Sequence, residues 1–279
     1  MKKVELLTEE HLTLIPARDP SGNKGSFGRV LVIAGSRCMA GAAYLSATAA
    51  YRAGAGLVHI FTPEDNRIIL QTLVPEAVMT TYDCKHVDIS LLSKAVEKAD
   101  SIVIGPGLGT SEAARELLHF VLFTAEQPTC IDADALNIIS QSPGELGLLG
   151  EKHLLTPHVK EFSRLAGVSV DNIKKDPAGQ VAKFADMYNT NVVLKDADTH
   201  IATCNGKLYK NTFGNCGMGT GGSGDVLSGI IGALLAIKEL DIGTAGALGV
   251  LIHALAGDAA AAERSERSIM ARDLLEYIR

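Results

Sequence analysis

Short runs of apolar residues recur along the chain up to residue 194, and most of them stop next to Gly, Pro or Asp. They lack the alternation of apolar and polar positions that marks a strand with one face in water. A continuous apolar run is typical of a parallel strand covered on both faces. The runs are Val30–Ala34, Leu57–Phe61, Ile102–Ile104, Thr129–Ile131, His153–Leu155 and Val192–Leu194.

Longer stretches of helical character separate these runs, so that strands and helices alternate. Strand–helix–strand order predicts a parallel sheet joined by right-handed crossovers. The predicted helices are Gly41–Arg52, Val87–Lys98, Ser111–Phe123, Val159–Leu165 and Pro177–Tyr188.

The pattern changes in the C-terminal third. Ile201–Thr203 and Leu208–Asn211 flank Asn205-Gly206, a pair that favours a tight hairpin turn, so an antiparallel hairpin is expected at the edge of the sheet. No linker, repeat or low-complexity segment interrupts the chain. The sequence therefore predicts one domain over residues 1–279, with three α/β/α layers around a mostly parallel sheet. The last predicted helices are Asp225–Lys238, Thr244–Glu263 and Arg272–Ile278.

Composition supports this fold class. Of 279 residues 47% are hydrophobic, only 5% are aromatic and none is Trp. The core must therefore consist mainly of Ala, Val, Ile and Leu, which suits helices packed closely on a sheet. The formal net charge of −6 argues against nucleic acid as a partner, because binding to the phosphate backbone needs clustered Lys and Arg.

The sequence also bears on location. The five cysteines are dispersed, with no C-x-x-C pair, so neither a zinc site nor a disulfide framework is indicated and a reducing compartment is expected. Met1–Glu10 lacks the apolar segment of a secretory signal. The longest apolar run, Ile230–Ile237, is far shorter than the roughly 20 residues of a membrane helix. We expect a cytoplasmic protein that has no membrane partner.

The densest glycine cluster lies between Asn215 and Gly229, immediately around the start of a predicted helix. Glycine lets the backbone approach a ligand closely, and the first turn of a helix offers unpaired N–H groups and a positive dipole end. The cluster therefore predicts an anion site. Its match to the dinucleotide fingerprint G-x-G-x-x-G is superficial, because the expected βαβ context is missing. The chain contains no P-loop motif.

Asp225 stands just inside that helix. A carboxylate there would repel an anionic ligand unless it serves the reaction. One interpretation is a general base that takes a proton from a substrate hydroxyl while nearby N–H groups hold a phosphoryl group. The other is a structural acid that caps the helix and favours its dipole.

Two turns of small residues, Ser36–Ala43 and Gly105–Ser111, follow predicted strands. Ligands of open α/β sheets bind beyond the carboxyl ends of the strands, so both turns could line one crevice. Gly105–Ser111 could equally be a tight turn with no ligand. Ser36–Ala43 could admit a ligand through Gly41 and Ala42, or its small residues could serve close packing alone.

Charged residues follow three further strands. Asp132 and Asp134 could contact a ligand, or one of them could cap a helix. His158 and Glu161 could contact substrate and Mg²⁺ respectively, or belong to a Pro-initiated helix with an acid in its first turn. Lys195–Thr199 offers a cation and a hydroxyl to a nucleotide phosphate, or is an ordinary charged turn.

Taken in their order along the chain, six short motifs closely resemble those of the NAD(P)H-hydrate dehydratase family, a branch of the ribokinase-like superfamily. The resemblance covers nearly the whole chain. Each motif is weak alone, but six in family order are specific. They are Lys24–Gly28, Ala34–Ser36 with Met39–Ala43, Gly105–Gly109, Asp132–Leu136, Thr156–Glu161 and Gly221–Gly229.

The resemblance implies a ribokinase-like fold and a nicotinamide-repair activity. Such an enzyme dehydrates the S-epimer of NADHX or NADPHX, the C6-hydrated cofactors, back to NAD(P)H. ADP or ATP donates a phosphoryl group to the hydrate hydroxyl, phosphate is then eliminated, and Mg²⁺ neutralises the nucleotide phosphates. Stand-alone members resemble the bacterial ADP-dependent group.

Residue roles follow from motif position. Asp225 is expected to be catalytic, and the hydrate is expected to contact Ala42, Gly109, His158 and Asp225. Glu161 is expected to support Mg²⁺ only indirectly. One departure from the family pattern is Asp196-Ala197, where relatives carry small residues. The residues expected to bind the nucleotide are Lys195, Asp196, Ala197, Asp198, Thr199, Gly222, Ser223 and Gly224.

The resemblance further suggests a homo-oligomer, in particular a tetramer. The epimerase domain often fused to this one is not found in the sequence, so cooperation with a separate NAD(P)H-hydrate epimerase is expected. Two alternatives remain at this stage. The glycine cluster and Asp225 would also suit a kinase for hydroxyethylthiazole or hydroxymethylpyrimidine, and a non-catalytic nucleotide-binding sensor would need the cluster alone.

Overall fold

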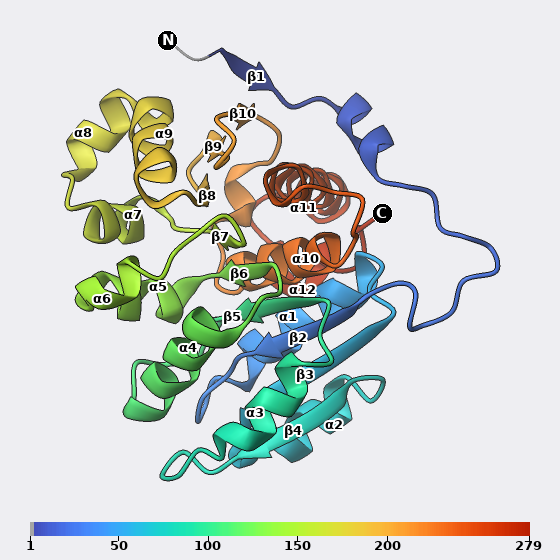
Figure 1. Ribbon diagram of the computed structural model, residues 1–279. Helices are drawn as coiled ribbons and strands as arrows, with labels where there is room; N and C mark the ends of the chain where they lie inside the picture. Colours follow the sequence, from blue (N-terminus) through green and yellow to red (C-terminus); the bar gives the residue numbers. More distant parts are fainter. Residues whose placement is uncertain (1–2) are drawn as a thin grey trace.

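The computed structural model describes residues 3–279 and places ten strands in one mixed sheet (Figure 1). The strand order is β1-β10-β9-β8-β7-β6-β5-β2-β3-β4. All neighbours from β8 to β4 are parallel, whereas β9 is antiparallel to both β8 and β10. The strands are β1 (Val4–Leu6), β2 (Arg29–Ile33), β3 (Leu57–Pro63), β4 (Val78–Tyr82), β5 (Ser101–Ile104), β6 (Thr129–Ile131), β7 (His153–Leu155), β8 (Asn191–Leu194), β9 (Thr199–Ala202) and β10 (Leu208–Asn211).

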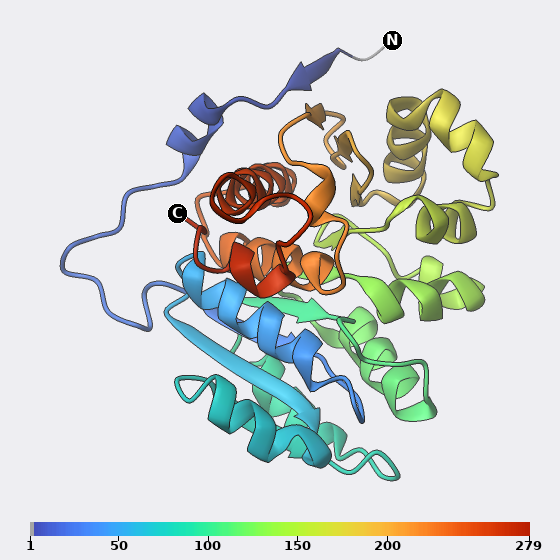
Figure 2. The same cartoon turned by 180° about the vertical axis from the view of Figure 1, so that it is seen from behind.

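Helices cover both faces of this sheet, as the two opposite views show (Figures 1 and 2). One face carries α1 (Ala40–Arg52), α2 (Arg67–Leu73), α10 (Ser223–Leu235), α11 (Ile242–Arg264) and α12 (Ala271–Leu274). The other carries α3 (Ile89–Val96), α4 (Glu112–Thr124), α5 (Ala133–Gln141), α6 (Pro143–Leu146), α7 (Val159–Ala166), α8 (Val170–Lys175) and α9 (Pro177–Tyr188). The described residues also form three short 3-10 helices, namely η1 (Glu9–Leu14), η2 (Glu64–Asn66) and η3 (Cys216–Met218).

The sheet separates two apolar cores. In β2, Val30 and Val32 join the core beneath α1 and α10, whereas Leu31 and Ile33 join the core beneath α4 and α5. Side chains alternate between the faces of a strand, and both faces here are covered. This explains why the strands appear in the sequence as unbroken apolar runs, and it confirms the predicted three-layer fold with a mostly parallel sheet.

Small residues bring α10 against the centre of the molecule. A Cβ on Gly229 would lie 2.1 Å from the carbonyl oxygen of Ser46 in α1, and one on Gly232 would lie 2.4 Å from Cγ2 of Val103 in β5. Ser101 Oγ donates to the Gly232 carbonyl at 2.6 Å, close to the start of β5. Gly232 lies near the amino end of β5. The N-terminus of α10 must therefore point toward the opposite end of the sheet, where the parallel strands have their carboxyl ends.

The structure adds elements that the sequence pattern does not reveal. The predicted hairpin of β9 and β10 is confirmed, but β1 pairs in parallel with β10 and forms the outermost strand. The opposite edge is β4, reached through α2. Both edge strands are partly exposed and contain polar residues, so they do not stand out as apolar runs.

Helix α11 is the one helix among residues 3–279 that is long and apolar enough to cross a membrane by length and composition. Its most apolar window is 72% buried inside the fold. It also packs against α10 and several strands. We therefore interpret it as a core helix.

Candidate active site at the carboxyl ends of the strands

The structure brings the predicted turns together at one edge of the sheet. Strands β2, β5, β6, β7 and β8 are neighbours in the sheet. The residues that directly follow them are, in the same order, Ala34, Gly105, Asp132, Thr156 and Lys195. The first turn of α10 lies over the same edge. A Cβ on Gly224 would lie 3.3 Å from Lys195 Nζ and 3.8 Å from Asp132 Oδ2.

The start of α10 has the geometry of an anion site. Gly222 is the N-cap residue with φ of +92°, a left-handed conformation that favours glycine, and a Cβ there would lie 2.5 Å from Leu45 Cδ1. Ser223 N–H donates to the Thr220 carbonyl at 3.3 Å. Within the described residues the N–H groups of Gly224 and Asp225 have no acceptor, so both are free to bind an anion.

Asp225 does not cap α10, because the N-cap is Gly222 and no side chain caps that end. Its carboxylate has no hydrogen-bond partner among residues 3–279, although it is partly buried. Burial and the negative charges of Asp132 and Asp134 raise the pKa of Asp225 to about 7, against the opposing charge of Lys195. A carboxylate with this pKa and no internal partner can accept a proton near neutral pH.

Beneath it lies a buried ion pair. Lys195 Nζ contacts Asp132 Oδ1 at 2.8 Å, and the Asp132 side chain is 1% exposed. Burial alone would raise the pKa of Asp132, but the Lys195 charge and the surrounding hydrogen bonds hold it below its ordinary value. The ammonium predicted to bind nucleotide is thus already paired, and it lies directly under the anion site with 23% of its side chain exposed.

His158 and Glu161 form a capping box at the start of α7. His158 Nδ1 accepts the N–H groups of Lys160 and Glu161 at 3.1 and 3.2 Å, and Glu161 Oε2 accepts the His158 N–H at 2.8 Å. Nε2 of the neutral ring therefore carries the hydrogen. Burial and the nearby cations Lys195 and Arg164 lower the pKa of His158, so it is neutral near pH 7. His158 Nε2 lies 3.4 Å from Glu161 Oε1, and half of the His158 side chain remains exposed.

Glu161 is committed to this box because its Oε2 atom accepts the His158 N–H. Its side chain is 8% exposed, and burial raises its pKa. Among residues 3–279 no three His, Cys, Asp or Glu side chains gather closely enough to hold a metal ion. A Mg²⁺ ion at this site would take its remaining ligands from phosphate oxygens and water, as is common beside nucleotides.

The turns after β2 and β5 touch each other. A Cβ on Gly107 would lie 2.7 Å from Ala42 Cβ, and one on Gly109 would lie 3.7 Å from Ser36 Oγ. Gly109 N–H donates to Asp134 Oδ2 at 2.8 Å, with φ of +74°. The two turns that carry Ala42 and Gly109 are therefore neighbours, and the shared role of these two residues stays a prediction.

The rest of the Lys195–Thr199 turn is bound within the protein. Asp198 pairs with Lys210 at 2.7 Å, Asp196 accepts the N–H of Ala197 at 2.9 Å, and Thr199 donates to the Asp196 carbonyl at 3.4 Å. Asp196 through Asp198 are exposed.

Sequence reasoning missed the residues that hold the site from behind. His253 on α11 contacts Ser223 Oγ through Nε2 at 3.2 Å, and burial lowers its pKa to about 4. Ser228 Oγ donates to Asp132 Oδ2 at 2.6 Å. A single histidine in an apolar helix carries no signal of such a contact, whereas Ser228 lies inside the quoted glycine motif and could have been noticed.

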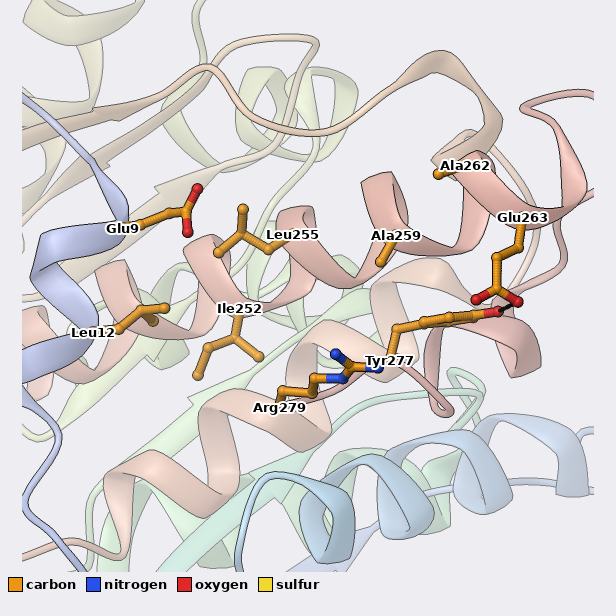
Figure 3. A pocket seen from close by; sticks show the side chains of 9 residues that line it. All are labelled: Glu9, Leu12, Ile252, Leu255, Ala259, Ala262, Glu263, Tyr277 and Arg279. Carbon is orange, nitrogen blue, oxygen red and sulfur yellow. Dashed lines mark hydrogen bonds between the residues drawn. The ribbon is translucent and has the colours of Figure 1, made fainter.

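A separate pocket of about 480 Å³ lies between η1, α11 and the C-terminal segment (Figure 3). Tyr277 donates to Glu263 there at 2.6 Å. None of the predicted site residues lines it. The lining residues are Glu9, Leu12, Ile252, Leu255, Ala259, Ala262, Glu263, Tyr277 and Arg279.

Solved structures share this architecture. A ribokinase-like superfamily protein from Enterococcus faecalis matches with a TM-score of 0.88 and 32% identity, covering 99% of this chain and 94% of its own. The ADP/ATP-dependent NAD(P)H-hydrate dehydratase from Bacillus subtilis, co-crystallised with ATP/Mg²⁺, matches with a TM-score of 0.84 and 31% identity, covering 99% and 96%. The three-layer fold and the glycine turn at the strand ends therefore define an α/β protein of the ribokinase-like class.

Sequence comparisons narrow this further. The profile of the NAD(P)H-hydrate dehydratase family matches residues 30–279. The ADP-dependent (S)-NAD(P)H-hydrate dehydratase of Neisseria meningitidis is 37% identical over 248 residues, which are 87% of this chain and 80% of that protein. The chain belongs to the NAD(P)H-hydrate dehydratase family. It spans about half the length of curated relatives such as the bifunctional NAD(P)H-hydrate repair enzyme of Coxiella burnetii, which is 40% identical and covered to 52%.

Proposed function

We propose that this protein is an ADP-dependent dehydratase that converts the S-epimer of hydrated NADH or NADPH back to NAD(P)H. The observation that carries the proposal is the Asp225 carboxylate, which has a raised pKa and no internal partner beside two free backbone N–H groups. The named activities of the Neisseria and Bacillus relatives support it.

The reaction proceeds in two steps. Asp225 takes the proton of the C6 hydroxyl as that oxygen forms a bond to the terminal phosphorus of the nucleotide, and the bond from phosphorus to the leaving oxygen of the shortened nucleotide breaks. The C6–O bond then breaks, and phosphate leaves with the bonding electrons while the ring nitrogen supplies an electron pair toward C6. Transfer of a C5 proton to water restores the dihydronicotinamide. The N–H groups of Gly224 and Asp225 stabilise the transferring phosphoryl group.

The remaining residues bind and orient the two substrates. The hydrate lies between Ala42, Gly109 and the half-exposed side chain of His158. The nucleotide lies along Lys195–Thr199 and Gly222–Gly224, with the ion pair of Lys195 and Asp132 below it. Mg²⁺, when bound, neutralises phosphate charge, and Glu161 supports it indirectly by fixing His158 and the start of α7.

The wider setting is part of the same proposal. Residues 1–279 act as one domain, and the protein works in the cytoplasm as a homotetramer. It uses hydrate whose R-epimer is converted to the S-epimer by a separate NAD(P)H-hydrate epimerase. The single continuous sheet supports the assignment of one domain, and the bifunctional repair enzymes among the relatives support a link to a second repair activity.

The test is the near-ultraviolet absorbance of dihydronicotinamide as purified protein meets NADH hydrate and Mg²⁺. Parallel samples contain ADP, ATP or no nucleotide. We expect a rise that requires nucleotide and is fastest with ADP. No rise with any of the three, in the presence of hydrate that an authentic dehydratase consumes, would contradict the proposal. Stable phosphorylation of hydroxyethylthiazole or hydroxymethylpyrimidine by the same sample would indicate a small-alcohol kinase instead.

A further inference from the structure

The turn after β6 departs from what its sequence would favour locally. Asp132 is the N-cap residue of α5, a position where Asp usually accepts a hydrogen bond from the first helical turn, yet its side chain makes no such bond. The next residue, Ala133, has φ of +49°, in the left-handed region that disfavours any residue with a side chain. The chain thus forgoes a cap and holds a strained residue here.

The Asp132 carboxylate is directed toward α10 instead. Oδ1 accepts from Thr156 Oγ1 at 2.7 Å and from Lys195 Nζ at 2.8 Å, while Oδ2 accepts from Ser228 Oγ at 2.6 Å. Ser228 also contacts the Gly224 carbonyl at 3.0 Å. One buried carboxylate therefore links the ends of three strands to the first turns of α10. With both oxygens occupied, it has little capacity left for a ligand.

This link places the Lys195 cation where it acts on Asp225. The ammonium lies under Gly224, the residue before Asp225, and Asp132 supplies the opposite charge. The charged groups that face Asp225 are Asp132 after β6, Lys195 after β8 and Asp134 on α5. Without Asp132, the Lys195 charge would stabilise an ionised Asp225 and weaken it as a base.

We propose that Asp132 is a positioning residue that fixes Lys195 beneath the anion site and neutralises its charge, so that Asp225 keeps its affinity for a proton. The inference rests on the proposed role of Asp225 as the base. It assigns no ligand contact to Asp132 itself.

The test is Asp132→Asn, which keeps the shape of the side chain and removes its charge. In the free protein, carbon NMR of labelled aspartate follows the Asp225 carboxyl, assigned by its loss in Asp225→Asn. The unaltered protein should titrate near pH 7, the value to which the pKa of Asp225 is raised. In Asp132→Asn the titration should move down by about one pH unit, as expected for loss of a nearby negative charge. The acid limb of kcat/KM should move with it.

Matched controls are Ser228→Ala and Thr156→Val, which each remove one hydrogen bond to Asp132 but leave its charge. Both should lower the melting temperature without moving the Asp225 titration. An unmoved titration in folded Asp132→Asn, or an equal shift in the controls, would overturn the proposal. If Asp132→Asn does not fold, the unaltered protein decides. Asp132, whose pKa is held below its ordinary value of 3.8, must stay ionised throughout the pH range in which Asp225 titrates, and uptake of a proton together with Asp225 overturns the inference.

The NMR titration needs no substrate. If the protein shows no dehydratase activity, the proposed function fails while the titration still reports whether Asp132 sets the proton affinity of Asp225.

Discussion

Asp225 is the residue on which chemistry and stability conflict most directly. A carboxylate with no internal hydrogen bond loses hydration on folding, and this loss raises its pKa together with the charges of Asp132 and Asp134. The same loss makes it a better proton acceptor near neutral pH, because the catalytic efficiency of a general base is highest when its pKa is close to the working pH.

Replacing Asp225 by Asn should abolish most of the turnover. The amide cannot accept the hydroxyl proton, so we expect kcat to fall by about 10²- to 10⁴-fold. Nucleotide binding should persist, because the free N–H groups of the helix start remain. Steady-state kinetics with hydrate and ADP, together with calorimetric titration of the nucleotide, measure the two effects. Full activity in this variant would eliminate Asp225 as the base.

The same variant should be more stable at alkaline pH. A carboxyl whose pKa is raised on folding stabilises the native state less as pH rises from the unfolded pKa through the folded one. At about pH 8 we therefore expect Asp225→Asn to raise the free energy of unfolding by about 1–3 kcal/mol. The gain should disappear as pH falls to the ordinary value of 3.8. Urea unfolding at several pH values measures it, and a gain independent of pH would point to packing instead of charge.

At the scale of elements, α11 supports the glycine turn from behind. Asp258 accepts from the Gly214 N–H and from Asn215 Nδ2, both at 2.9 Å. A Cβ on Gly257 would lie 2.3 Å from Met218 Sδ, so this helix lies tightly against the loop that leads into α10.

Asp258→Ala should therefore loosen the anion site. Two partly buried donors lose their acceptor, and each such hydrogen bond contributes about 0.5–1.5 kcal/mol. We expect KM for the nucleotide to rise about tenfold, a change equivalent to roughly 1.4 kcal/mol. The matched control is Asp241→Ala, which removes the cap at the far end of α11, where Asp241 accepts from Thr244 N–H at 2.9 Å. It should lower stability alone, and an equal rise of KM in the control would refute a specific role for Asp258.

The strands and turns show which parts of the fold and of the site the sequence can predict. Val192–Leu194 was recognisable as a strand because both of its faces are buried. Val4–Leu6 and Val78–Tyr82 were not, because edge strands are exposed and gain their stability from pairing partners distant in sequence. The turns of the site were predicted from glycines and acids. The contact between Asp132 and Lys195 was not, since it depends on which strands become neighbours.

The whole molecule consists of two apolar cores on opposite faces of one sheet, with no residue common to both. Leu248 on α11 belongs to one core and Leu117 on α4 to the other, and each is at most 1% exposed. Changes at the two positions should therefore have independent effects.

Leu248→Ala and Leu117→Ala should each lower the free energy of unfolding by about 2–5 kcal/mol, because each leaves a cavity. Their effects should add to within about 0.5 kcal/mol in the double variant, as for sites without shared neighbours. Chemical denaturation of the four proteins completes the cycle. A coupling larger than this would show that strain passes through the sheet.

The separation of the two apolar cores by the sheet also matters for redesign of the protein. Helices α1, α10 and α11, which form or support the glycine turn, rest on one face, while α4 and α9 rest on the other. A library that varies only the core residues beneath α4 and α9 can search for heat-resistant versions while helices α1, α10 and α11 are left untouched. Nature has the same freedom, so relatives should diverge faster beneath α4 than beneath α10.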